Sequence, residues 1–129
     1  MKKMLKTVLL GAMGLFLTAP AMADAVLHIW SCKLNDGKTP ADILEVSKTW
    51  VDAAKTIDGG ADIELTLEFA YAANVPDGSF NFVLSMPNTR VWGVWEENYP
   101  GSAAAQVDVA WSEVATCSNS SLWNSVSIE

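Results

Sequence analysis

Positive charge is scarce in this sequence. Its 129 residues include eight lysines and arginines against fifteen acidic residues, together with one histidine and two cysteines. Nucleic acids and anionic membrane surfaces attract basic protein surfaces, so we expect neither of them as a partner. An excess of acidic residues keeps a protein soluble, and it also suits a basic protein partner.

The sequence also lacks the short motifs that identify common catalytic and cofactor sites. It contains no G-x-S-x-G, no H-E-x-x-H, no P-loop, no dinucleotide fingerprint and no haem-attachment motif. One histidine and two cysteines 85 residues apart form a poor metal-ligand set, and the acids of DGGAD (58–62) do not match an EF-hand. We expect no metal and no cofactor, and the sequence leaves open whether the protein is an enzyme.

The first 23 residues have the pattern of a secretory signal. Three lysines precede the apolar run 8–17, which is shorter than the roughly 20 residues that span a membrane. Ala21 and Ala23 supply a cleavage site. We expect cleavage after Ala23, a periplasmic location and no membrane association afterwards; an uncleaved anchor is the alternative, which the short run disfavours. The rest, 24–129, is expected to form one domain with five basic and fifteen acidic residues, a net charge near −10.

Hydrophobic periodicity in this remainder predicts four strands and three helices. Alternating apolar residues predict the strands at 25–34, 62–72, 79–86 and 121–128. Caps and 3.6-residue spacing predict helices from Pro40 to the DGG stop at 58–60, over 89–98, and from Ala103 to Ala115. This order predicts the β-α-β-β-α-β ferredoxin-like arrangement, an α+β fold whose four-stranded antiparallel sheet has its helices on one face.

The two cysteines fit this topology. In a ferredoxin-like sheet the last strand lies beside the first and runs against it, which places Cys117, just ahead of the last strand, near Cys32 at the end of the first. An oxidising compartment favours a disulfide between them. We therefore predict a structural Cys32–Cys117 bond, with a redox or metal site as the less favoured alternative.

The predicted strands also define two sheet faces. Ile63 and its apolar partners at every second position should pack on the helices, which puts Glu64, Glu68 and Asn81 on the opposite face. The first strand is apolar on both faces; if Leu27 and Ile29 pack under the helices, His28 and Trp30 join this polar set. With the tryptophans that follow the third strand, the candidates for lining a ligand cavity are His28, Trp30, Glu64, Glu68, Asn81, Trp92 and Trp95.

Each of these candidates has a structural alternative. A lone histidine on a strand is usually a hydrogen-bonded interior or interface residue, Glu64 and Glu68 suit a solvated face, and Trp92 and Trp95 suit a core or a lid. If the two glutamates enter a closed cavity, desolvation and mutual repulsion raise their pKa and make acid–base chemistry available.

Several segments resemble the dimeric α/β-barrel superfamily, which includes the antibiotic-biosynthesis-monooxygenase-like proteins. These segments are the first helix, TPADILEVSKTWVDAAK, the strand pair IELTLEFAYA and FNFVLSM, and the Trp-bearing segment that follows the third strand. The ends C-K-L-x-D-G-K-T and C-S-x-x-x-L-W-N-S also resemble small secreted bacterial proteins. The superfamily contains cofactor-free monooxygenases, haem-degrading enzymes and chlorite dismutases. The resemblance implies a homodimer around a cavity, and an Asn–Trp pair formed by Asn81 with Trp92 or Trp95; the mid-strand position of His28 does not match the haem-binding members.

Three hypotheses about function follow. The first is a periplasmic homodimer that binds a small apolar or aromatic molecule. One form of this hypothesis makes the protein a cofactor-free monooxygenase. The alternative is a non-catalytic acidic protein that binds or inhibits a basic secreted protein. A structural or stress-related role without a small ligand is the third hypothesis. The sequence favours binding over catalysis and leaves the ligand unidentified.

Overall fold

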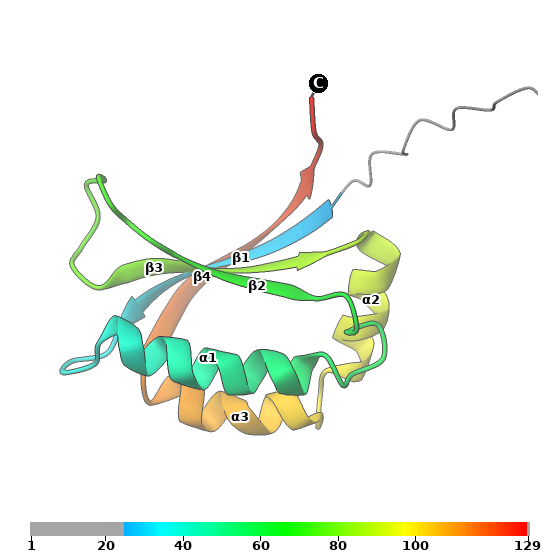
Figure 1. The fold of residues 1–129 in the computed structure, drawn as a ribbon, viewed down its shortest axis with the longest axis horizontal. Coiled ribbons are helices and arrows are strands. Elements are labelled where there is room, and N and C mark those ends of the chain that lie inside the picture. The colour runs from blue at the N-terminus through cyan, green and yellow to red at the C-terminus, as the bar shows by residue number, and fades with distance from the viewer. Residues whose placement is uncertain (1–24, 129) are drawn as a thin grey trace, which may run out of the picture.

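A computed structural model describes residues 25–128 of the chain (Figure 1). The elements follow the order β-α-β-β-α-α-β, and their bounds are β1 (Ala25–Leu34), α1 (Pro40–Ala54), β2 (Glu64–Phe69), β3 (Ser79–Met86), α2 (Thr89–Asn98), α3 (Ala103–Ser112) and β4 (Ala115–Ser125). The predicted signal sequence and its cleavage site lie outside the described residues. Among residues 25–128, no helix has the length and apolar character of a membrane span.

The strands form one antiparallel sheet in the order β2-β3-β1-β4. Helices α1 and α3 lie side by side along one face of this sheet, and α2 closes the end of the same layer (Figure 1). This is the predicted α+β ferredoxin-like arrangement, which the structure confirms. The segment between β3 and β4 contains two helices because Asn88 and Ser102 each cap a new first turn, accepting a backbone N–H three residues on.

Helix α1 begins and ends where local chemistry requires it. Thr39, just before the helix, and Asp42 in its first turn form a reciprocal capping box, and Pro40 between them suits the first helical position. After the helix, the chain turns back tightly at Gly60, where a side-chain carbon would collide with the carbonyl oxygen of Ala54. Glycine is therefore needed at position 60 for the chain to pass so close to the helix end.

The last strand differs from its prediction. β4 begins at Ala115, six residues before the predicted start at 121, and it pairs with β1 along its whole length, from Leu34 opposite Ala115 to Ala25 opposite Ser125. The residues ATCSNS lack apolar alternation because this half of the strand lies at the sheet edge, where most of its side chains are exposed. One extra residue, Ser118, is accommodated by a β-bulge. β2 is shorter than predicted, at 64–69, because its pairing with β3 ends at Phe69.

The predicted disulfide is present. Cys32 and Cys117 are direct partners on β1 and β4, with Cα atoms 3.9 Å apart, and their sulfur atoms are bonded. Cys117 thus lies within β4, not ahead of it. The bulge interrupts the register of β1 and β4 next to this point, and the disulfide bond fixes that register there.

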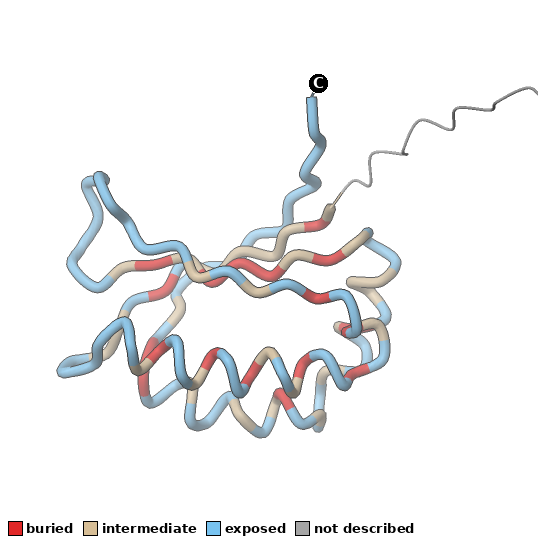
Figure 2. Tube along the Cα trace, in the orientation of Figure 1, coloured by how far each residue is buried: buried red, intermediate tan, exposed pale blue. Residues whose placement is uncertain are grey.

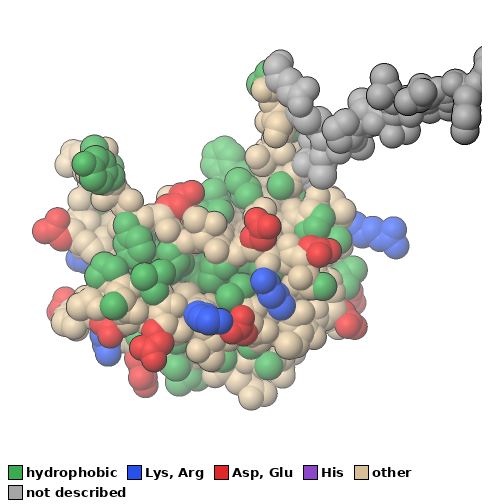
Figure 3. Space-filling model, in the orientation of Figure 1, with side chains coloured by type: hydrophobic (Ala, Val, Ile, Leu, Met, Phe, Trp, Pro, Cys, Tyr) green, Lys and Arg blue, Asp and Glu red, His purple; other side chains and the backbone are tan. Residues whose placement is uncertain are grey.

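The core lies between the sheet and the helices (Figure 2). Alternate residues of the two central strands point into it, and the stripe of α1 predicted from its periodicity faces them, with Ile43, Trp50 and Ala54 buried and Val46 half-buried. From the side, hydrophobic side chains are visible along the line where α1 meets the sheet, between scattered acidic and basic ones (Figure 3).

Candidate functional site

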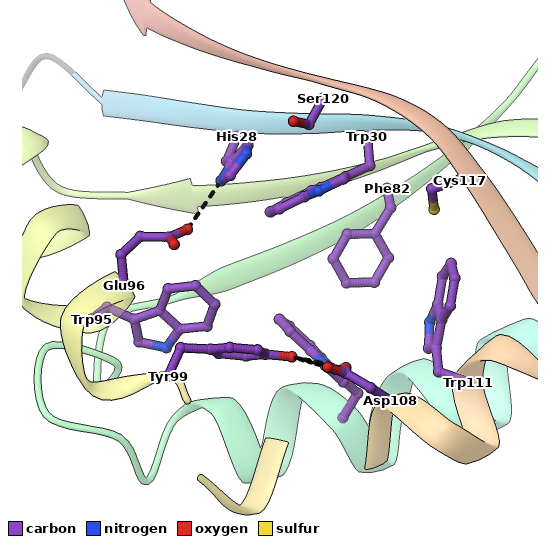
Figure 4. A pocket seen from close by; sticks show the side chains of 11 residues that line it. His28, Trp30, Phe82, Trp95, Glu96, Tyr99, Asp108, Trp111, Cys117 and Ser120 are labelled. Carbon is purple, nitrogen blue, oxygen red and sulfur yellow. Dashed lines mark hydrogen bonds and ion pairs between the residues drawn. The ribbon is translucent and has the colours of Figure 1, made fainter. Parts of the chain in front are cut away.

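A cavity of about 380 Å³ lies between the sheet and the helices (Figure 4). Its walls are mainly aromatic, with rings contributed by β1, β3 and all three helices: Trp30, Trp50, Phe82, Trp95, Tyr99 and Trp111. The polar groups on its wall are those of His28, Glu96, Asp108 and Ser120, and Cys117 completes the lining. This volume is at the lower end of the range for small-molecule sites, about 300 to 1,000 Å³.

The aromatic walls are organised around Phe82. Trp30 is its direct partner on β1, and the two rings meet edge to face at 5.6 Å. Trp50 from α1 and Trp111 from α3 make similar edge-to-face contacts with Phe82, at 5.1 and 5.5 Å. These edge-to-face contacts pack the rings against one another, and together with Trp95 and Tyr99 they form the walls of the cavity, which we call the box.

His28 lies at one end of this box, with its ring stacked on Trp30 at 3.6 Å. Its Nδ1 accepts a hydrogen bond from Nε1 of Trp92 at 3.3 Å, and Oε1 of Glu96 lies 3.4 Å from the same nitrogen. An Nδ1 that accepts the indole N–H carries no proton of its own, so the neutral ring is protonated on Nε2. The single lone pair of Nδ1 is then used by Trp92, so Glu96 lies beside the imidazole ring without a hydrogen bond to Nδ1.

Burial favours the neutral form of both groups. Desolvation lowers the pKa of His28 below its ordinary value of 6.5 and raises the pKa of Glu96 above its ordinary 4.5. The raising effect on Glu96 exceeds the opposing effect of its hydrogen bond with Trp92. The pair therefore holds a proton acceptor and a carboxyl group on the wall of a largely apolar cavity.

The lowered pKa of His28 predicts how stability changes with pH. The unfolded chain protonates its histidine near pH 6.5, whereas the folded chain protonates His28 only at lower pH, so its contribution to stability is present above pH 6.5 and is lost as pH falls toward the folded pKa. Glu96, with its raised pKa, acts in the opposite direction. As the pH is lowered from about 7.5 to about 5.5, we expect the wild type to lose unfolding free energy relative to His28→Gln. Urea titrations at each pH measure this difference.

Because His28 is the sole histidine of the chain, no second imidazole contributes in that range. Glu97→Gln, an exposed change next to Glu96, serves as the control. A difference between wild type and His28→Gln that stays constant over this pH range would contradict the assignment.

A second polar cluster lies at the helix side of the box. The Tyr99 hydroxyl donates to the carboxylate of Asp108, with both oxygens at 2.7 Å, and Trp50 Nε1 donates to Asp108 Oδ1 at 2.9 Å. Burial and the neighbouring Asp108 raise the pKa of Tyr99 well above its ordinary value, so the phenol remains a donor at neutral pH. This cluster fixes the orientation of a carboxylate that lines the cavity.

The structure brings four of the seven sequence candidates together and separates the other three. His28, Trp30 and Trp95 line the cavity, and Trp92 contacts His28. The predicted alternative that Leu27 and Ile29 pack under the helices is wrong: His28 is the partner of core residue Leu84, so Leu27 and Ile29 face away from the helices.

The remaining three candidates are Glu64, Glu68 and Asn81, and they lie on the opposite face of the sheet. Asn81 Nδ2 donates to Glu68 Oε2 at 3.3 Å there. Asn81 is therefore not adjacent to Trp92 or Trp95, the pairs that the resemblance implies. Both results follow from strand alternation, because His28 shares its face with the apolar residues of β2 and β3.

Sequence reasoning missed several wall residues. Trp50 and Trp111 stand in predicted helical stripes, where a core role explains them equally well. Glu96 lies four residues after Trp92 on α2, a spacing that puts both on one helix face. Asp108 is an exposed residue of α3 whose carboxylate reaches Tyr99 and Trp50 at the cavity wall, and the polar interruptions of the run AAAQVDVAW do not single it out.

Comparisons with known proteins show the fold. SnoaB, a cofactor-independent oxygenase from Streptomyces nogalater, superposes with a TM-score of 0.56 at 12% identity, over 82% of this chain and 97% of that one. A conserved protein of unknown function from Bacteroides thetaiotaomicron, described as a possible oxidoreductase, gives 0.52 at 13% identity, over 79% and 98%. No protein-family model matches the sequence, and neither does any curated protein. These two structures thus share the α+β architecture found here.

The cavity offers aromatic surface for a flat molecule, a hydrogen-bonding pair at one end and an oriented carboxylate at the other. In the described part of the chain, no group of three or more His, Cys, Asp or Glu side chains is placed to hold a metal ion. The side chains on the cavity wall can supply apolar contacts, hydrogen bonds and proton exchange.

Proposed function

We propose that the protein is a periplasmic, homodimeric binding protein for a small, flat, apolar or aromatic molecule that occupies the cavity between the sheet and the helices. The observation that carries this proposal is the box of six aromatic residues around a volume of about 380 Å³. Trp50, Phe82 and Trp95 are buried, whereas Trp30, Tyr99 and Trp111 are partly buried and gain apolar contact when a ring of the ligand fills the space.

The open face of the sheet supports the homodimer. Its centre is apolar, with Ile29 beside Val83 and Leu27 beside the exposed Trp123 on the edge strand. The helices cover the other face, so a second copy laid on this one would bury the apolar centre. A native mass spectrum of the exported protein reports the number of subunits and the mass of any molecule retained in the cavity.

Binding is tested with 2-naphthol, a neutral two-ring probe. At about 0.5 kcal/mol per non-hydrogen atom, within the usual range for small ligands, its expected Kd is about 0.1 mM. We expect Trp111→Ala to weaken this binding roughly tenfold in calorimetric titration, because the ring forms one side of the box.

Val109→Ala is the control, since Val109 is 70% exposed on α3, the helix that carries Trp111. Equal effects of the two variants, or no binding of 2-naphthol to the folded wild type, would overturn the proposal. If the cavity binds nothing and the protein instead captures a basic protein in a salt-sensitive complex, the acidic-inhibitor alternative becomes the better hypothesis.

Cofactor-free oxygenation is a second candidate function, favoured by the His28–Glu96 pair on the cavity wall. In such a reaction a base removes a proton from an activated CH₂ of a quinol-type ring, and the carbanion combines with O₂ to form a peroxide after protonation. Loss of water then leaves a carbonyl group in place of the CH₂, so one oxygen atom enters the product and the other enters water. With anthrone as substrate, oxygen uptake above the uncatalysed rate that disappears in His28→Gln would support this reaction.

A further inference from the structure

The charges on the cavity wall are of one sign. Glu96 and Asp108 are the two carboxyl groups that line it, and none of the described lining residues is a lysine or arginine. His28 contributes no lasting positive charge, since burial lowers its pKa. An anionic ligand would have no cationic partner here and would meet the carboxylate of Asp108.

Asp108 is oriented without being neutralised. Its hydrogen-bond donors are the hydroxyl of Tyr99 and the indole N–H of Trp50, both of which are uncharged. Among the described residues, the contacts between basic and acidic side chains within 4 Å are Lys48–Asp52 and His28–Glu96, so Asp108 has no basic partner at that distance. Donors of this kind hold the carboxylate in place and leave its negative charge available to a ligand.

The aromatic walls favour the same sign of ligand charge. The faces of indole, phenol and benzene rings carry partial negative charge, and tryptophan attracts cations most strongly. Four tryptophans, a tyrosine and a phenylalanine line this cavity, with rings at steep angles to one another around Phe82. Figure 4 shows these rings entering the space from the sheet on one side and from the helices on the other. Boxes of this composition suit quaternary and alkylated ammonium groups.

A bare metal ion does not suit the site, because the carboxyl groups are not grouped with further His, Cys, Asp or Glu side chains among the described residues. A large, weakly hydrated organic cation needs no such ligand set. Its positive charge is spread over alkyl or aryl groups, which lose little hydration when they contact aromatic rings.

We propose that the natural occupant of this cavity is a small organic cation, an alkylated ammonium group attached to an apolar or aromatic body. The inference rests on the proposed function, which places a small ligand in the same cavity, and it adds the charge of that ligand. The ammonium group lies against the aromatic walls near the oriented carboxylate of Asp108, and the apolar body extends along Trp30 and Phe82 toward the His28 end.

Two probes of nearly identical shape test this inference: (3-hydroxyphenyl)trimethylammonium and its neutral counterpart 3-tert-butylphenol. Calorimetric titration of the full protein at about 50 mM salt should show the cation binding at least about tenfold more tightly than the neutral probe. The preference should decrease as salt is raised, whereas the binding of 3-tert-butylphenol should change little.

Carboxyl variants locate the origin of this preference. Asp108→Asn should remove most of the difference between the two probes and leave the binding of 3-tert-butylphenol within about twofold, and Glu96→Gln should have a smaller effect in the same direction. Glu97→Gln removes the same charge from an exposed position beside Glu96 and should leave the preference intact. Circular dichroism of each variant verifies that it is folded.

The outcomes separate the two proposals. If both probes bind with equal affinity, or the neutral one binds better, the cation inference fails and the proposed binding function stands. If Asp108→Asn and Glu97→Gln have equal effects, the preference comes from net charge and not from the cavity, which also overturns the inference. If neither probe binds to the folded wild type, the proposed function fails together with the inference.

Discussion

Replacing Cys32 and Cys117 with alanine is expected to lower the free energy of unfolding by about 4 to 5 kcal/mol. The bond closes a loop across 85 residues of sequence, so its loss gives the unfolded chain a large gain in conformational freedom. The total stability of a domain of this size is about 5 to 15 kcal/mol, which makes this a large part of it.

The bond also acts in the folded state. It joins β1 to the edge strand β4 beside the bulge at Ser118, and Cys32 is buried in the core. Without it, β4 is held by its backbone pairing with β1 and by few buried side chains, because most residues of the strand are exposed. We therefore expect β4 to separate from the sheet more often, which faster hydrogen exchange of its amides would reveal.

Urea unfolding followed by tryptophan fluorescence measures the change. The wild type treated with dithiothreitol should match the double variant, and Ser118→Ala, an exposed change on the same strand, should lie within about 0.5 kcal/mol of the untreated wild type. A double variant as stable as the oxidised wild type would show that the pairing of β1 and β4 does not depend on the bond.

The disulfide and the fold were predictable from the sequence for the same reason. Strand alternation in β1 and β3, and the capping box around Pro40, are local signals that structure at a distance does not reverse. Once they give the element order, the antiparallel pairing of first and last strands follows from topology, and so does the proximity of Cys32 and Cys117. The start of β4 was not predictable in this way, since its first half is mostly polar and exposed and lacks the apolar alternation that identifies a strand.

The site was predictable in part. The sequence identified His28, Trp30 and Trp95 as candidates, but the two apolar faces of β1 left the orientation of this strand open. The register of β1 with β3 decides it, by placing His28 opposite Leu84 in the core. The role of Asp108 could not be predicted from the sequence. Its hydrogen-bond partner Trp50 is 58 residues away, and the contact exists only after α1 and α3 have packed together.

Trp50→Ala is expected to reduce the free energy of unfolding by about 3 to 5 kcal/mol, as is usual when a large aromatic side chain is deleted from a core. Trp50 is 5% exposed, and its ring contacts Phe82 on the sheet, Trp95 on α2 and Tyr99 beyond it. The side chain thus links α1 to three other parts of the molecule. Its removal leaves a space that these neighbours cannot close without moving.

The same substitution should affect the cavity. Trp50 Nε1 is one of the two donors that orient Asp108, so the carboxylate loses a partner together with one wall of the box. Trp50→Phe separates the two effects, because it keeps an aromatic ring against Phe82 and removes the N–H. We expect Trp50→Phe to recover most of the lost stability, and to bind the cationic probe less tightly than the wild type does.

Trp123→Ala is the control for deletion of an indole. Trp123 is 58% exposed, and its Nε1 donates to Ser121 on the same strand, so its removal at the same low protein concentration should cost less than about 1 kcal/mol. Equal losses for Trp50→Ala and Trp123→Ala would contradict the role of Trp50 as the side chain that joins α1 to the sheet and to α2. A Trp50→Phe variant that binds both probes as the wild type does would instead show that the indole N–H does not orient Asp108 for ligand binding.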